Sequence, residues 1–145
     1  MSSSPIASAM LLRPVVALNP WTFGMEVWMY ATRIPAIAQM NPQISSTATR
    51  AVFDARTPAS VRWKADNYNH LFEQPTQFYA VLLVLALARG NNELDGRLAW
   101  VYVGLRVAHS LVHVSSNKLM VRFTLFAASS LVLLGLTARA TMLLF

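Results

Sequence analysis

Four long apolar segments restrict the fold of this chain more than any other feature of its sequence. The first has 23 residues and spans about 35 Å as a helix, which is enough to cross a bilayer. Charged residues make up only 12% of the chain, against about 25% in soluble proteins, and the mean hydropathy is +0.43. We therefore predict an all-α, multi-pass integral membrane four-helix bundle, a single domain over residues 1–145 with helices at about residues 15–37, 63–88, 98–115 and 119–136.

The composition excludes several classes of function. The chain has no cysteine, which excludes disulfides, cysteine nucleophiles and thiolate metal sites, so any thiol chemistry must use the thiol of a substrate. The net charge is +6, but the basic residues do not gather on an aromatic-studded polar surface, and we expect no nucleic-acid partner. The N-terminal stretch "MSSSPIASAMLLRPVV" lacks basic residues at its start, and Arg13 and Pro14 interrupt its apolar run. We therefore predict no cleaved signal peptide.

The distribution of lysine and arginine predicts the orientation in the membrane. Four crossings place the first and third connections on one side and both termini on the other. The first side, with the helix flanks included, carries Arg33, Arg50, Arg56, Arg62, Lys64, Lys118 and Arg122. The second side carries Arg13, Arg89, Arg97 and Arg139. Seven basic residues against four predict that both termini are non-cytoplasmic.

Polar side chains inside the apolar segments form two stripes at helical spacing. The acidic, amide-rich stripe on the second segment comprises Asp66, Asn69 or His70, Glu73 and Gln77. The basic stripe lies in the stretch "RVAHSLVH" and comprises Arg106, His109 and His113. A charge inside a membrane costs about 2.5–3.5 kcal/mol on insertion scales and needs a partner or water. We predict that the stripes meet across a polar cleft open to the cytoplasm, paired first through Glu73 and Arg106 and second through Glu26 and Arg106.

Two other interpretations of these stripes remain open. Buried ion pairs also fix helix register without binding a ligand, so both stripes would then be structural contacts within the bundle. Histidines at positions i and i+4, such as His109 and His113, can chelate a metal or a haem iron. Since no third ligand stands at a convincing spacing, we predict no metal site.

Three short stretches, taken in order, resemble the MAPEG proteins, the membrane-associated proteins of eicosanoid and glutathione metabolism. They are "NHLFEQPTQFYA", "RVAHSLVH" and "KLMVR". The resemblance covers almost the whole chain, because the number of helices and the long first connection also agree. It implies a homotrimer in the lipid bilayer that binds glutathione, as a co-substrate, between neighbouring subunits near the cytoplasmic side.

The resemblance also implies roles for single residues. Glu73 matches the glutamate of the family's second helix, and Arg33 resembles the basic residue that contacts the tripeptide from the first helix. Arg106 and His109 match the third helix of the prostaglandin E synthases, and Arg122 falls where that pattern has its catalytic arginine. The predicted glutathione-binding residues are therefore Arg33, Asn69, His70, Glu73, Arg106, His109 and His113. His70 occupies a place where the compared enzymes have asparagine, and His113 one where they have tyrosine.

The predicted function is that of a glutathione-dependent membrane transferase or peroxidase. Its second substrate would be a small lipophilic electrophile that enters from the bilayer. A free thiol has a pKa of about 8.5, and a nearby cation favours the reactive thiolate. We assign this role to Arg122, with Lys118 as the rival. The alternative is a non-catalytic oligomeric membrane protein that binds glutathione or another small anion.

Overall fold

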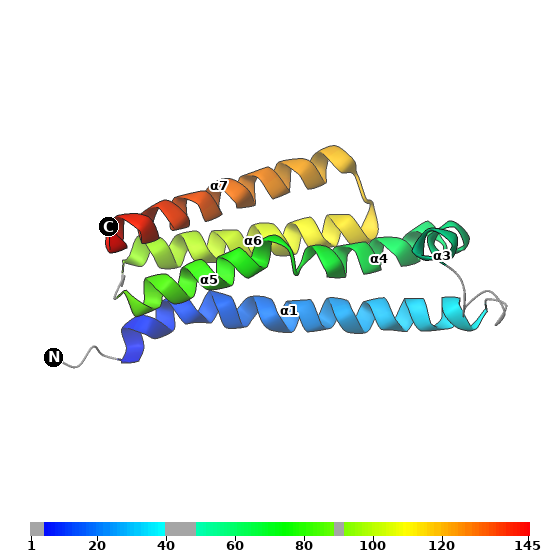
Figure 1. The fold of residues 1–145 in the computed structure, drawn as a ribbon, viewed down its shortest axis with the longest axis horizontal. Coiled ribbons are helices and arrows are strands. Elements are labelled where there is room, and N and C mark those ends of the chain that lie inside the picture. The colour runs from blue at the N-terminus through cyan, green and yellow to red at the C-terminus, as the bar shows by residue number, and fades with distance from the viewer. Residues whose placement is uncertain (1–4, 40–48, 89–91) are drawn as a thin grey trace.

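A computed structural model describes residues 5–39, 49–88 and 92–145 of the chain (Figure 1). All of its regular elements in these ranges are helices, so the prediction of an all-α bundle is confirmed. The helices are α1 (Pro5–Ala38), α3 (Arg50–Arg56), α4 (Ala59–His70), α5 (Gln74–Leu87), α6 (Glu93–Ser115) and α7 (Leu119–Leu144).

The long helices lie roughly alongside one another, with α4 and α5 following each other along one rod (Figure 1). Helix α1 packs against α4, α5 and α6, and α7 packs against α6 and α5. The first turns of α1 and the end of α7 lie at the same end of the bundle. The short helix α3 lies at the opposite end, beside the start of α4.

The second predicted helix, over residues 63–88, is in fact two helices with a break at residues 71–73. Pro75 stands in the first turn of α5, where its missing N–H is tolerated, whereas inside a continuous helix it would remove a hydrogen bond. The carbonyl oxygen of His70, the last residue of α4, is thereby left for other donors. The break places His70 and Glu73 on either side of a tight bend.

Each of the other three predicted helices is correct at one end and too short at the other. Helix α1 begins at Pro5 rather than near residue 15, and α7 continues to Leu144 rather than ending near residue 136. Helix α6 begins at Glu93, because the side chain of Asn92 accepts a hydrogen bond from the backbone N–H of Leu94 at 2.9 Å. The long first connection contains α3.

Among the described residues, only α7 is both long enough and apolar enough to cross a membrane on its own composition. Helix α5 has 14 residues, fewer than the about 20 needed for a span. Helix α6 is long enough, but Arg97, Arg106 and two acidic residues of its first turn reduce its apolar character.

The main apolar core lies in the half of the bundle nearer the two chain ends. There the rings of Phe78 and Tyr102 stack at 4.2 Å between centroids. The cluster consists of Leu11, Leu18, Phe78, Leu82, Leu85, Ala99, Tyr102, Val103, Leu133, Leu136 and Ala140. At the same end, the fully buried carboxylate of Asp95 pairs with Arg139, which joins the first turn of α6 to α7. The opposite half of the bundle has a smaller apolar cluster of Met25, Leu71 and Val114, and it also buries several polar side chains.

Candidate functional site

A layer of polar side chains is buried where α4, α6 and α7 meet. Its members are Asn67 of α4 and Arg106, His109, Ser110 and His113 of α6. The amide of Asn67 donates to the hydroxyl of Ser110 at 2.7 Å, which ties α4 to α6. The basic stripe predicted on α6 is therefore real, and it faces the interior of the bundle.

Arg106 is the most deeply buried charged side chain of this layer, with 1% of its surface exposed. Its Nη2 donates to the backbone carbonyl of His70 at 3.0 Å, across the break between α4 and α5. Its guanidinium carbon lies 5.8 Å from the ring centroid of Phe126. Within the described ranges, its Nε and Nη1 have no hydrogen-bond partner.

The predicted ion pair between Glu73 and Arg106 is wrong. Among the described residues, the carboxylate of Glu73 instead contacts Nδ1 of His70 at 2.5 Å. The second choice, Glu26, lines a separate cavity of about 80 Å³ between α1 and Phe72. The physical reason is the bend after His70, which takes Glu73 out of helical register with α4.

Three imidazole rings gather around this bend. The ring centroid of His70 lies 5.0 Å from that of His109 and 6.2 Å from that of His113, and Phe126 stacks on His70 at 5.3 Å. In the part of the chain that the structure describes, no group of three histidine, aspartate or glutamate side chains is arranged to hold a metal ion. The cluster therefore carries no metal assignment.

A polar cleft of about 340 Å³ opens beside this cluster. We use "polar cleft" for the space lined by Asp66, Asn69, His70, Glu73, His113, Asn117 and Arg122. It combines carboxylates, an arginine, imidazoles and side-chain amides from α4 and the break after it, from the end of α6, and from the turn into α7 and its first turn. Such a lining suits a ligand that carries charges of both signs.

A second cavity of about 150 Å³ adjoins the polar cleft. We use "apolar trough" for the space lined by His70, His109, Leu119, Arg122, Phe123 and Phe126. His70 and Arg122 line both spaces. These two side chains therefore mark the place where a polar ligand and an apolar ligand would meet.

The position of Arg122 is fixed by the turn between α6 and α7. Its Nη1 donates to the side-chain oxygen of Asn117 at 2.5 Å, and Asn117 has a φ of 49°, in the left-handed region. Asparagine tolerates this conformation better than most residues. Lys118, the rival candidate, is exposed and lines neither the polar cleft nor the apolar trough.

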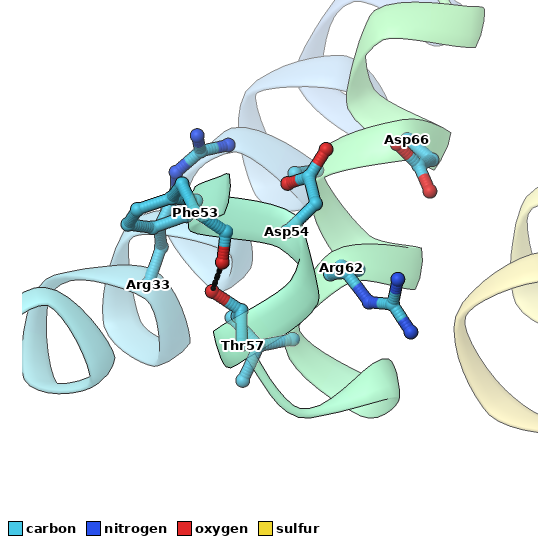
Figure 2. A pocket seen from close by; sticks show the side chains of 8 residues that line it. Arg33, Phe53, Asp54, Thr57, Arg62 and Asp66 are labelled. Carbon is cyan, nitrogen blue, oxygen red and sulfur yellow. Dashed lines mark hydrogen bonds between the residues drawn. The ribbon is translucent and has the colours of Figure 1, made fainter. Parts of the chain in front are cut away.

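Arg33 lies outside both spaces. Figure 2 shows it beside Phe53 of α3, with its guanidinium carbon 5.0 Å from the ring centroid. The hydroxyl of Thr57 donates to the carbonyl of Phe53 at 2.8 Å, which closes the end of α3 beneath this contact. Arg33, Phe53 and Thr57 line a small third pocket, which also includes Asp66. Asp66 lines the polar cleft as well, so this pocket and the polar cleft are neighbours.

The MAPEG family model matches residues 11–142, nearly the whole chain. The chain belongs to the MAPEG family. It is accordingly a membrane protein of the family of glutathione and eicosanoid metabolism, as the sequence resemblance predicts. Comparison with curated proteins gives no match, and neither does comparison with solved structures.

In this MAPEG protein, six of the eight predicted site residues line the polar cleft or the apolar trough. They are Asn69, His70, Glu73, His109, His113 and Arg122. Arg33 stacks on Phe53 in the adjoining pocket, and Arg106 is buried behind His70. The predicted site omits Asn117, although the "SSN" turn signal at the end of the third segment points to its position.

Proposed function

We propose that this protein is a glutathione-dependent membrane transferase or peroxidase that acts on small lipophilic electrophiles. The observation that carries the proposal is the meeting of the polar cleft and the apolar trough at His70 and Arg122. A reaction between a charged tripeptide and a lipophilic molecule needs two adjacent spaces of opposite character, with the sulfur at their boundary.

The polar cleft has groups for each end of glutathione. The tripeptide carries two carboxylates, one ammonium group and a thiol. His113 can donate a hydrogen bond to a carboxylate, and Glu73 can bind the ammonium group. The amides of Asn69 and Asn117 can bind the peptide bonds.

Arg122 is the residue that we assign to the thiolate. It stands in the first turn of α7, where the helix dipole adds positive potential. A fixed cation at this position favours the charged form of the sulfur and so raises the fraction of reactive thiolate. The hydrogen bond from Arg122 to Asn117 keeps its guanidinium at the boundary of the two spaces.

The apolar trough suits the second substrate. Leu119, Phe123 and Phe126 give it an apolar lining, and the side chains of Leu119 and Phe123 are largely exposed on the outer face of α7. A lipophilic molecule can therefore approach from the bilayer without passing through the polar cleft.

Assembly and topology belong to the same proposal. We propose a multi-pass homotrimer with both termini on the non-cytoplasmic side, and the exposed apolar face at the start of α7 supports burial against lipid or another subunit. Native mass spectrometry in a mild detergent should detect a trimer. A reporter fused to the C-terminus should be active only outside the cytoplasm.

A non-catalytic role is the second candidate, and the place of Arg33 favours it. This arginine stacks on Phe53, outside the polar cleft, so one of the predicted tripeptide contacts is engaged elsewhere. The protein would then bind glutathione or another small anion without turnover.

One experiment separates the two candidates. Purified protein is titrated with glutathione up to millimolar concentration by isothermal calorimetry, and then assayed for conjugation of an aryl halide. Binding with turnover supports the transferase, and binding without turnover of any electrophile supports the second candidate. If glutathione does not bind, both candidates are contradicted as proteins that bind glutathione.

A further inference from the structure

We propose that His70 is the general base that removes the proton from the thiol of the bound tripeptide, with Glu73 as the residue that orients it. This inference rests on the proposed function. It adds a proton acceptor to a site in which Arg122 alone can only stabilise charge, because a guanidinium has no lone pair for a proton.

The contact between His70 and Glu73 defines which ring nitrogen is available. Nδ1 of His70 lies 2.5 Å from Oε2 of Glu73. A carboxylate accepts hydrogen bonds, so the nitrogen facing it carries the proton and the neutral ring has its lone pair on Nε2. A carboxylate placed in this way also stabilises the imidazolium that forms when Nε2 takes a proton.

The location of His70 distinguishes it from the other two histidines. His109 lines only the apolar trough, and His113 lines only the polar cleft, whereas His70 lines both. The reacting sulfur must lie at the boundary between these spaces. Of the two side chains that reach this boundary, His70 and Arg122, only the imidazole can accept a proton.

The ring and the backbone of His70 are both held in place. Phe126 stacks on the ring with an interplanar angle of 28°, and Arg106 donates to the backbone carbonyl at 3.0 Å. The side chain of His70 is still 21% exposed, and that of Glu73 is 66% exposed. A general base needs this combination of fixed orientation and access to the ligand.

The proposed step with an aryl halide is balanced as follows. The S–H bond breaks and its proton forms an N–H bond at Nε2 of His70, while Arg122 stabilises the thiolate. The sulfur electron pair forms the C–S bond, and the halide leaves with the electrons of its bond to carbon. The proton on Nε2 then passes to water in the polar cleft, which returns His70 to its neutral form.

A comparison of the thiolate formed with the protons released tests this role directly. Glutathione is mixed with the protein at about pH 8, where a free thiol is still mostly protonated, in weak buffer with a pH indicator. Thiolate formation is followed by ultraviolet absorbance and proton release by the indicator. We expect thiolate formation without matching proton release, because the proton stays on His70. Release of one proton per thiolate in the wild-type protein would overturn the proposal.

Variants provide a second readout. In His70→Asn, the amide can still donate to Glu73 but cannot take up a proton, so we expect kcat for conjugation to fall by about 10²-fold. The KM for glutathione should change little. Glu73→Gln should give a smaller fall, because His70 keeps its lone pair but loses the carboxylate that stabilises its protonated form. Arg97→Gln, at the exposed opposite end of α6, is the matched control and should keep the wild-type rate.

The outcomes separate this inference from the proposed function. No calorimetric binding of glutathione contradicts the proposed function itself. Binding and conjugation at the wild-type rate in His70→Asn contradict only the role of His70. If His70→Asn does not fold, the proton-release measurement on the wild-type protein still tests the role of His70.

Discussion

Arg106 donates a hydrogen bond to the backbone carbonyl of His70, which links the middle of α6 to the break between α4 and α5. The break leaves this carbonyl outside the regular helical pattern, where its other donor is the N–H of Glu73 at 3.4 Å. Arg106 supplies the closer donor at 3.0 Å. The bend that forms one wall of the polar cleft therefore depends on a side chain 36 positions away in the sequence.

Arg106→Met should destabilise the protein, because it removes the closer donor to this carbonyl. A hydrogen bond that involves a charged group contributes about 1.5–3 kcal/mol, and loss of the buried charge offsets part of this, so we expect a net cost of about 1 kcal/mol. The measurement is the thermal unfolding midpoint in detergent. Arg97→Met, on an exposed part of the same helix, is the control and should shift the midpoint much less. An equal shift in both variants would contradict the role of Arg106.

Arg139→Leu should destabilise the protein more strongly. It leaves the fully buried carboxylate of Asp95 without its cation, and breaking a buried pair costs about 3–5 kcal/mol. We expect the lower end of this range, because the side chain of Arg139 is 31% exposed. The double variant Asp95→Leu/Arg139→Leu should lose less than the sum of the two single variants. Strict additivity in the unfolding midpoints would show that the two side chains do not interact in the membrane.

Arg122→Leu should abolish conjugation while leaving much of the glutathione affinity. The thiolate loses its stabilising cation, but Asn69, Glu73 and His113 still line the polar cleft. Calorimetry with glutathione and the ultraviolet absorbance of the bound thiolate measure the two effects separately. Conjugation at the wild-type rate would remove Arg122 from the mechanism. Lys118→Leu is the comparison, and we expect it to keep its activity because Lys118 lines neither space.

Asn117→Gly should lower the conjugation rate without unfolding the protein. Glycine adopts the φ of 49° without strain, but it lacks the side-chain oxygen that accepts from Arg122. Asn117→Val should instead lower the unfolding midpoint, because a β-branched residue is disfavoured in the left-handed region. Full activity in the glycine variant would mean that Arg122 does not need this hydrogen bond.

Helical periodicity predicts the stripe on α6 correctly, because Arg106, His109 and His113 belong to one uninterrupted helix. The same use of helical periodicity predicts the wrong partner for Glu73. It assumes a continuous helix over residues 63–88, and the break after His70 removes the register that would carry Glu73 toward Arg106. Pro75 is visible in the sequence, but proline is tolerated in membrane helices, so its presence alone does not predict a break.

Contacts between distant helices are harder to predict. Asp95 and Arg139 are 44 positions apart, and no pattern within either segment indicates that their helices are neighbours at this level. The same holds for Asn67 and Ser110, which are 43 positions apart. The family resemblance narrows the site to a set of residues, whereas the boundary formed by His70 and Arg122 follows only from the packing of α4 against α6 and of α6 against α7.

The two arginines of α7 also determine how this helix can sit among lipids. Arg122 and Arg139 are 17 positions apart, or about 26 Å along the helix, which is shorter than the about 30 Å of a hydrocarbon core. Arginines near the ends of membrane helices commonly extend toward phosphate headgroups. Here each guanidinium already has a partner within the protein, Asn117 for Arg122 and Asp95 for Arg139. The carboxylate of Asp95 neutralises Arg139, whereas Asn117 is an uncharged partner, so an acidic headgroup or an anionic ligand matters more for Arg122 than for Arg139.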